Sequence, residues 1–150
     1  MPQGHEPDQV RSQRGPADPA SGPRNGQGIR RIVRAMACSL RGVRAAFTSE
    51  RAFRQEIAVA AILIPAACAL PFSAIERLAL VGSVLLVLVV ELLNTAIEKT
   101  LDRLSTETHP LTGAAKDMGS AAVLLAIVIM ILAWLSIAGP VIVGLLTIGY

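Results

Sequence analysis

The stretch LALVGSVLLVLVVELLNTAIEKTLDRL, residues 78–104, decides the fold class of this chain. Its first half carries no charged side chain, and with the flanking residues it predicts a helix over about residues 75–97. Such a helix is long enough to cross the ~30 Å hydrocarbon core of a membrane. Glu91 interrupts the apolar run near its end, and an intramembrane carboxylate is costly enough to indicate a functional site. We therefore expect an integral membrane protein with polar chemistry at one end of this helix.

Glu91 belongs to a polar stripe along the predicted helix. At 100° per residue, Asn94, Glu98 and Asp102 fall with Glu91 within an arc of about 80°. Glu91 lies roughly 24 Å along the helix from Ile75, near one edge of the hydrocarbon core, so Glu98 and Asp102 lie beyond it in water. A carboxylate at the lipid edge is suited to accept a proton, and carboxylates in water suit Mg²⁺.

An ordinary solvated helix end is the alternative interpretation of this stripe. Glu98 and Asp102 could pair with Lys99 or Arg103, and such surface ion pairs are common and need no function. This alternative does not explain Glu91, which stands within the apolar run LVLVVELL.

Two further membrane crossings are expected. The first is predicted over about residues 57–70; it is short, Pro65 interrupts it, and a tight turn at residues 71–74 (PFSA) joins it to the second. The third is predicted over about residues 119–138 and ends at Gly139-Pro140. The expected fold class is thus an all-α integral membrane protein with three transmembrane helices.

The remaining segments have distinct compositions. Residues 1–28 are rich in Pro, Gly, Gln, Ser and Arg, which predicts a disordered tail, and they lack the apolar region of a secretory signal peptide. Residues 29–56 combine apolar residues at 3.6-residue spacing with many arginines, which predicts an amphipathic surface helix in the lipid headgroup layer. Residues 98–118 form a polar connection, and residues 139–150 an apolar C-terminal extension along or just outside the third crossing.

The distribution of positive charge predicts the orientation. Ten of the fourteen Lys and Arg residues precede residue 55, whereas Lys99, Arg103 and Lys116 cluster around the polar connection and Arg77 stands alone. With three crossings, the two basic regions share one side of the membrane. The positive-inside rule assigns that side, and with it the N-terminus, to the cytoplasm.

Composition excludes several classes of function. The chain is 53% hydrophobic with a mean hydropathy of +0.55, which argues against a soluble globular protein. Aromatic residues make up only 3%, too few for the base-stacking surfaces of nucleic-acid-binding proteins. Cys38 and Cys68 form neither a disulfide framework nor a metal-binding pattern. The phosphate-binding motifs of soluble kinases are absent, so any phosphoryl transfer uses another architecture.

Lys116 opens the third predicted crossing. Ser120 shares its helical face, and Asp117 is adjacent. A lysine at a helix start opposes the helix dipole, so we expect Lys116 to have a phosphate or carboxylate partner.

Two blocks of the sequence resemble the prokaryotic diacylglycerol kinase family, which includes the undecaprenol kinases of Gram-positive bacteria. They are ELLNTAIEKTLDRL (residues 91–104) and HPLTGAAKDMGSAAV (residues 109–123), and RGVRAAFTSERAFRQE (residues 41–56) resembles the family's surface helix. The resemblance covers about residues 29–138. It implies a homotrimer in the bacterial inner membrane, with active sites shared between subunits, that transfers the γ-phosphoryl group of MgATP to a lipid hydroxyl at the cytoplasmic face.

The same resemblance implies roles for individual residues. Glu91 would be the general base toward the lipid hydroxyl, and Glu50 and Glu98 would hold the Mg²⁺ that bridges the nucleotide phosphates. The nucleotide would be bound by Arg31, Glu50, Glu98, Glu107, Thr108, His109, Lys116 and Asp117. The lipid would be bound by Arg31, Arg44, Ala45, Ala46, Phe47, Ala52, Phe53, Arg54, Gln55, Glu56, Glu91, Asn94 and Ser120.

The chain departs from the family pattern at two positions, and alternatives stay open. Thr108 stands where relatives commonly carry an aromatic residue, and Ala114 where a basic residue is often found. The GSAA sequence of the second block favours diacylglycerol as the acceptor, with undecaprenol as the alternative. A small oligomeric membrane transporter with Glu91 in a polar pathway, or a scaffold without chemistry, are alternatives of a different class.

Overall fold

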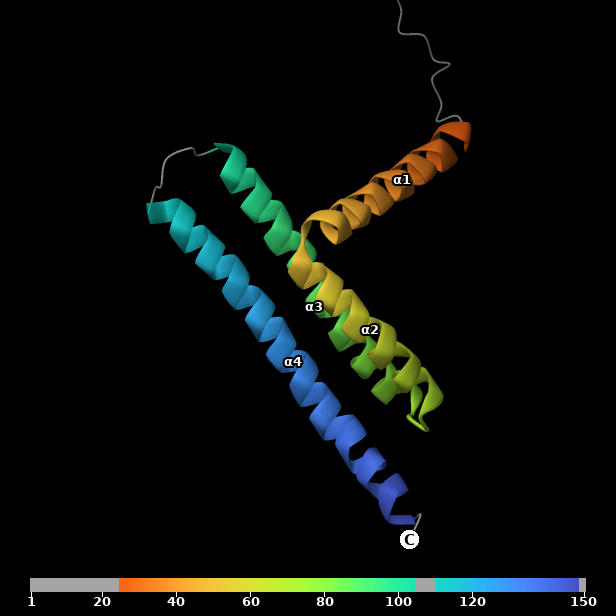
Figure 1. Cartoon of the computed structure of the whole chain (residues 1–150). Coiled ribbons are helices and arrows are strands. Elements are labelled where there is room, and N and C mark those ends of the chain that lie inside the picture. The colour runs from red at the N-terminus through yellow and green to blue at the C-terminus, as the bar shows by residue number, and fades with distance from the viewer. Residues whose placement is uncertain (1–24, 105–109, 149–150) are drawn as a thin grey trace, which may run out of the picture. The chain divides into compact units, whose positions relative to one another are not determined.

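The computed structural model describes residues 25–104 and 110–148, and every secondary-structure element in these ranges is a helix. In chain order the helices are α1 (Asn25–Ser49), α2 (Arg51–Ala69), α3 (Ala74–Leu104) and α4 (Pro110–Ile148) (Figure 1). The predicted all-α fold class is confirmed. Most of the predicted disordered tail lies outside the described residues.

The chain divides into two units, one ending at Ser39 and one beginning at Leu40. The described part of the first unit is the N-terminal part of α1. Its large apolar side chains are all more than half exposed: Ile29, Ile32, Val33 and Met36. A basic helix with an uncovered apolar face is typical of helices that lie at a membrane surface.

The junction between α1 and α2 differs from the prediction of one helix over residues 29–56. The hydroxyl groups of Thr48 and Ser49 donate hydrogen bonds to carbonyl oxygens one turn earlier, and Glu50 is extended, with φ −105° and ψ 124°. Side chains that bond to the local backbone compete with helix continuation. Helix α1 therefore ends at Ser49, and residues 51–56 form the first turns of α2 instead.

Three helices are long and apolar enough to cross a membrane, namely α2, α3 and α4. The expectation of an integral membrane protein is confirmed. Each predicted crossing has a counterpart, although the helices are longer than predicted because the polar residues at both ends of the 98–118 segment are helical as well.

The turn between α2 and α3 is held by specific hydrogen bonds. Ser73 and Glu76 form a reciprocal capping box at the start of α3, with the Ser73 amide 2.8 Å from Glu76 Oε2. The Arg77 guanidinium donates to the carbonyl oxygens of Ala67 (3.1 Å) and Phe72 (3.2 Å). Arg77 thus closes the C-terminus of α2, where its positive charge also complements the helix dipole.

Helix α4 has 39 residues, about 58 Å, and continues through Pro140. The prediction that it ends at Gly139-Pro140 was wrong. None of the described glycines has a positive φ, so Gly139 does not adopt the left-handed conformation that ends helices. Proline removes one hydrogen bond, whereas an interrupted helix in apolar surroundings would leave several backbone groups unpaired.

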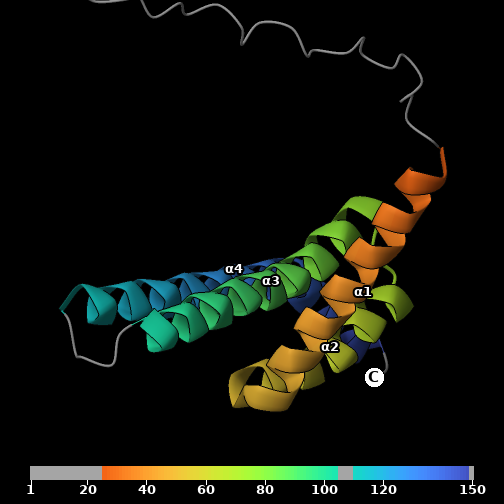
Figure 2. The ribbon, with the colours of Figure 1, turned by 90° about the horizontal axis from the view of Figure 1, so that it is seen from above.

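Helix α3 packs against both α2 and α4 (Figures 1 and 2). Near the α2–α3 turn, a buried cluster joins the three helices through Ala67, Phe72, Leu80 and Ala138, with Trp134 and Val141 packed against it. Many large apolar side chains on α2, α3 and α4 remain exposed, as expected for helices whose surroundings are lipid or further subunits.

Candidate active site

The polar stripe predicted on the second crossing lies on the packed face of α3. Glu91 is 5% exposed and Asn94 is 8% exposed, and they follow the buried Val84 and Val87 at helical spacing. Glu98 is half-buried, and Asp102 is exposed. The stripe therefore runs from the interior of the bundle to solvent, in the order that the sequence predicted.

The Asn94 side chain contacts Glu98 one turn later in α3 and also contacts α4. Its Nδ2 atom donates a 3.2 Å hydrogen bond to Glu98 Oε1. Its Oδ1 atom is buried without a hydrogen-bond partner among the described residues, and it lies against Gly119 of α4 so closely that a Cβ there would overlap it. A side chain at Gly119 would thus require the Asn94 amide to shift, and this amide orients one of the predicted metal-binding carboxylates.

Four carboxylates gather in this region from two helices and a helix junction. Glu50 and Glu98 are close enough to Glu91 for their charges to interact with it, and Glu56 of α2 interacts with Glu91 in the same way. Negative charges at such separations repel one another unless cations lie near them. The arrangement therefore favours the binding of cations.

Two lysines of the same region each pair with a carboxylate. Lys116 forms an ion pair with Asp102, which supplies the carboxylate partner expected for it, and its charge also interacts with Glu98. The ammonium group of Lys99 lies 3.3 Å from Glu50 Oε1. Lys99 thus pairs with a carboxylate outside its own helix, whereas the alternative interpretation offered Lys99 or Arg103 as partners of Glu98 and Asp102.

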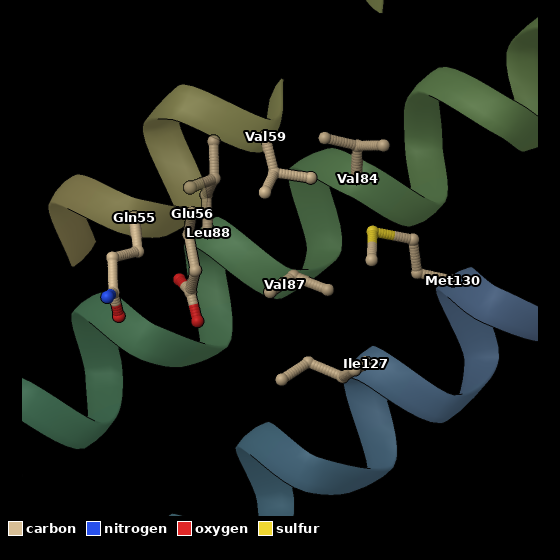
Figure 3. Close-up of a pocket in the computed structure, with 8 residues that line it drawn as sticks. All are labelled: Gln55, Glu56, Val59, Val84, Val87, Leu88, Ile127 and Met130. Atoms are coloured by element: carbon tan, nitrogen blue, oxygen red, sulfur yellow. The ribbon is translucent and has the colours of Figure 1, made fainter. Parts of the chain in front are cut away.

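A cavity of about 210 Å³ lies among α2, α3 and α4. The carboxyl group of Glu56 and the amide of Gln55 lie at one end of it, and apolar side chains such as Val87, Ile127 and Met130 line the rest (Figure 3). Glu56 Oε2 is buried and has no hydrogen-bond partner among the described residues. The cavity thus combines an apolar interior with one buried polar atom that has no partner. That atom belongs to Glu56, whose charge interacts with that of Glu91.

Most of the other predicted site residues lie in the second unit of the chain, and they differ in how far they are buried. Ala46 and Phe53 are buried, whereas Ala45, Phe47, Ala52 and Gln55 are exposed. The remaining exposed members are Arg44, Arg54, Asp117 and Ser120. The Arg54 guanidinium donates to the carbonyl oxygen of Phe47 at 3.2 Å, so it closes the C-terminus of α1.

Four predicted nucleotide-binding residues are not placed with the site. Arg31 lies in the first unit of the chain, and Glu107, Thr108 and His109 lie outside the described residues.

Several residues that lie close to the candidate active site were not predicted from the sequence. Thr95 is buried beside Asn94, with 6% of its surface exposed, and it was not among the residues predicted for the site. Ser49 and Lys99 meet where α1 ends before Glu50, a break that was not predicted from the sequence. Gly119 was recognised as a small residue that permits close packing, but its contact with Asn94 depends on the register of α3 and α4.

The donor set suits Mg²⁺ only together with a phosphate ligand. Among residues 25–104 and 110–148, no three His, Cys, Asp or Glu side chains gather as a complete metal-binding group. Mg²⁺ in kinases is commonly held by one or two carboxylates, with phosphate oxygens and waters completing its shell. Glu50 and Glu98 fit that role, and a buried carboxylate beside them fits the removal of a proton from a hydroxyl group.

Comparisons with known proteins point in the same direction. The family model described as "Prokaryotic diacylglycerol kinase" matches residues 37–138. Diacylglycerol kinase of Escherichia coli strain K12 is 48% identical over 110 residues, which cover 73% of this chain and 90% of that protein. The Pseudomonas aeruginosa PAO1 enzyme of the same name is 48% identical over 110 residues (73% and 89%), and that of Haemophilus influenzae Rd is 44% identical over 107 residues (71% and 91%).

Proposed function

The chain belongs to the prokaryotic diacylglycerol kinase family, and from this premise we propose that it transfers the γ-phosphoryl group of MgATP to the hydroxyl group of diacylglycerol. The product is phosphatidic acid. The observation that carries the proposal is the burial of Glu91 at the end of a membrane-length helix, among carboxylates suited to a nucleotide-bound cation. All of these residues lie within the matched region, from residue 37 to residue 138. We propose that the kinase domain spans residues 29–138.

Glu91 is the proposed general base. It accepts the proton of the lipid hydroxyl as the new bond from that oxygen to the γ-phosphorus forms, and the bond from the γ-phosphorus to the ADP oxygen breaks. Its place at the buried end of the stripe keeps bulk water away from the reacting hydroxyl. Asn94 and Ser120 contribute to the lipid site, together with the segments at residues 44–47 and 52–56.

Glu50 and Glu98 are the proposed ligands of Mg²⁺, which neutralises the charge of the transferring phosphate when it is bound. Asn94 orients Glu98 through its hydrogen bond. We propose that Lys116 and Asp117 contact the nucleotide. For Lys116 this means that a phosphate replaces Asp102 as its partner, since both groups offer anionic oxygen acceptors to the ammonium group. Nucleotide binding by Arg31, Glu107, Thr108 and His109 stays a prediction from the family resemblance.

The assembly and location follow the same line. We assign the protein to the bacterial inner membrane, with the N-terminus in the cytoplasm, because the basic residues cluster at the ends that share one side. A homotrimer with active sites shared between subunits is supported by the extensive exposed apolar surfaces of α2, α3 and α4, which a neighbouring subunit can cover.

The deciding experiment is ATP-dependent phosphorylation of diacylglycerol by the purified full-length chain in mixed micelles, with Glu91→Gln as the variant. We expect the wild type to form phosphatidic acid and the variant to lose at least about a hundredfold in turnover, because general-base catalysis typically contributes 10²–10⁴-fold. Turnover on undecaprenol but not on diacylglycerol would identify undecaprenol as the acceptor and would leave the proposed phosphoryl transfer unchanged. No transfer to either lipid would refute the proposal.

A second pair of variants separates the kinase from the transporter alternative. Glu98→Ala and Lys116→Ala should each abolish most of the lipid phosphorylation, because both residues are placed on the nucleotide side. A transporter that uses Glu91 would tolerate both changes far better, since neither residue lies in the apolar part of the helix.

A further inference from the structure

The ammonium group of Lys99 connects α3 with the junction of α1 and α2. Its Nζ atom lies 3.3 Å from Glu50 Oε1 and donates a hydrogen bond to Ser49 Oγ. The Ser49 hydroxyl is itself 3.0 Å from the same Glu50 oxygen. The three groups therefore form one closed network, in which Lys99, a residue with no assigned role, places a positive charge beside Glu50.

Glu50 is available for this network because it performs no other structural duty. It occupies the N-cap position of α2, yet its side chain makes no capping hydrogen bond. A carboxylate at this position also interacts favourably with the N-terminal end of the helix dipole. Lys99 supplies the neutralising charge.

We propose that Lys99 is the resting counter-ion of Glu50 and competes with the divalent cation for its carboxylate, so that it sets the Mg²⁺ concentration at which the site fills. The proposal rests on the proposed function, which gives Glu50 its metal. The ammonium group engages Oε1, and a divalent cation that binds this carboxylate meets the repulsion of the positive charge beside it. Occupation of Glu50 by the metal therefore requires Lys99 to move away.

Ser49 defines where Lys99 remains after that exchange. Its hydroxyl accepts from the ammonium group independently of Glu50, so one of the two anchors persists when the carboxylate changes partner. The displaced ammonium group stays near the site, and the exchange is reversible when the nucleotide leaves.

The pair is partly exposed, which limits the size of the expected effect. The side chain of Lys99 is 48% exposed and that of Glu50 is 29% exposed. Ion pairs of this exposure change a binding equilibrium by a few-fold rather than by orders of magnitude. We therefore expect removal of the Lys99 charge to tighten metal binding by about threefold.

The test measures Mn²⁺ binding to the full-length chain in micelles by electron paramagnetic resonance, in the presence of a non-hydrolysable ATP analogue that supplies the phosphate ligands. Lys99→Met should lower the Kd for Mn²⁺ about threefold, and Lys99→Arg, which keeps the charge, should stay close to the wild type. Arg103→Met is the matched control, because it removes one positive charge from the same face of α3, one turn farther along, at a position with no ion pair to Glu50 among the described residues. It should leave the Kd unchanged.

A kinetic measurement complements the binding data. In Lys99→Met, half-maximal activity should require less Mg²⁺ at saturating ATP, while the KM for ATP at saturating Mg²⁺ stays the same. An unchanged or weaker Mn²⁺ affinity in Lys99→Met, an equal gain in Arg103→Met, or a rise in the KM for ATP alone would overturn the proposal. A wild type that phosphorylates neither lipid would instead refute the kinase assignment, so the two failures are distinguishable.

Discussion

At the scale of single residues, the site depends on how each carboxylate is held. Glu91 is buried on the packed face of α3, Glu98 receives a hydrogen bond from Asn94, and Glu50 faces Lys99. The three carboxylates therefore have different surroundings: an interior position, an orienting amide and a competing cation. Such differences are consistent with the different roles proposed for these groups, one as general base and two as metal ligands.

Asn94→Ala tests the orienting hydrogen bond. The change removes the donor to Glu98 Oε1, and hydrogen bonds to charged groups contribute about 1.5–3 kcal/mol, so we expect the apparent Mg²⁺ affinity to fall roughly tenfold or more. The measurement is lipid phosphorylation as a function of MgCl₂ concentration. Thr100→Ala is the control, because the Thr100 hydroxyl bonds only to the backbone of its own helix, at Ala96. Equal Mg²⁺ dependence of the two variants would count against a role of Asn94 at the metal.

At the scale of elements, the contact between α3 and α4 depends on one position without a side chain. A Cβ at Gly119 would overlap Asn94 Oδ1, whereas one at Gly82 on α3 would meet no atom within 4 Å. A side chain would therefore be accommodated at Gly82 but would meet Asn94 at Gly119, although both glycines lie in helices. Gly119 allows a close approach, and Gly82 only lowers the helix propensity of its segment.

Gly119→Ala should destabilise the packing of α4 against α3 by about 1–3 kcal/mol, the usual cost of overpacking. Gly82→Ala should be neutral or stabilising by up to about 1 kcal/mol, because alanine favours the helix. Both are measured by SDS titration of the protein in micelles, followed by the fluorescence of Trp134. This residue is the chain's single tryptophan and packs against the cluster between the helices. Equal shifts in the two variants would contradict the assigned contact.

At the scale of the whole molecule, α4 extends past the cluster through which it packs against α2 and α3. Val141 is the last of its residues packed against the cluster at the α2–α3 turn, and Ile142 and Val143 are exposed. The region that matches the family ends at residue 138. The part of α4 after residue 138 thus extends beyond the region that matches the family, and the exposed Ile142 and Val143 belong to that extension.

Deletion of residues 142–150 should therefore leave lipid phosphorylation close to that of the full chain. Deletion from residue 134 onward should abolish folding, because it removes Trp134 and Ala138 from the buried cluster. Activity and the SDS midpoint of both truncations check the expectation. A large loss of activity in the shorter deletion would show that the extension contributes to the assembly or to the site.

The sequence by itself determined the membrane fold, the polar stripe and its order along α3. These features follow from hydrophobic run length and helical periodicity, which act locally and can be read residue by residue. It also placed Glu91 at the buried end of the stripe, because a carboxylate within an apolar membrane helix faces the interior of the bundle and not the lipid.

Only the tertiary structure decided which charges meet. The pairing of Lys99 with Glu50 and of Lys116 with Asp102 depends on the break at Ser49 and on the relative register of α3 and α4. The continuation of α4 through Pro140 was likewise decided by the apolar surroundings and not by the local Gly-Pro signal. The physical reason is the same in each case: partners that are distant in sequence are selected by packing, and local propensity carries no information about them.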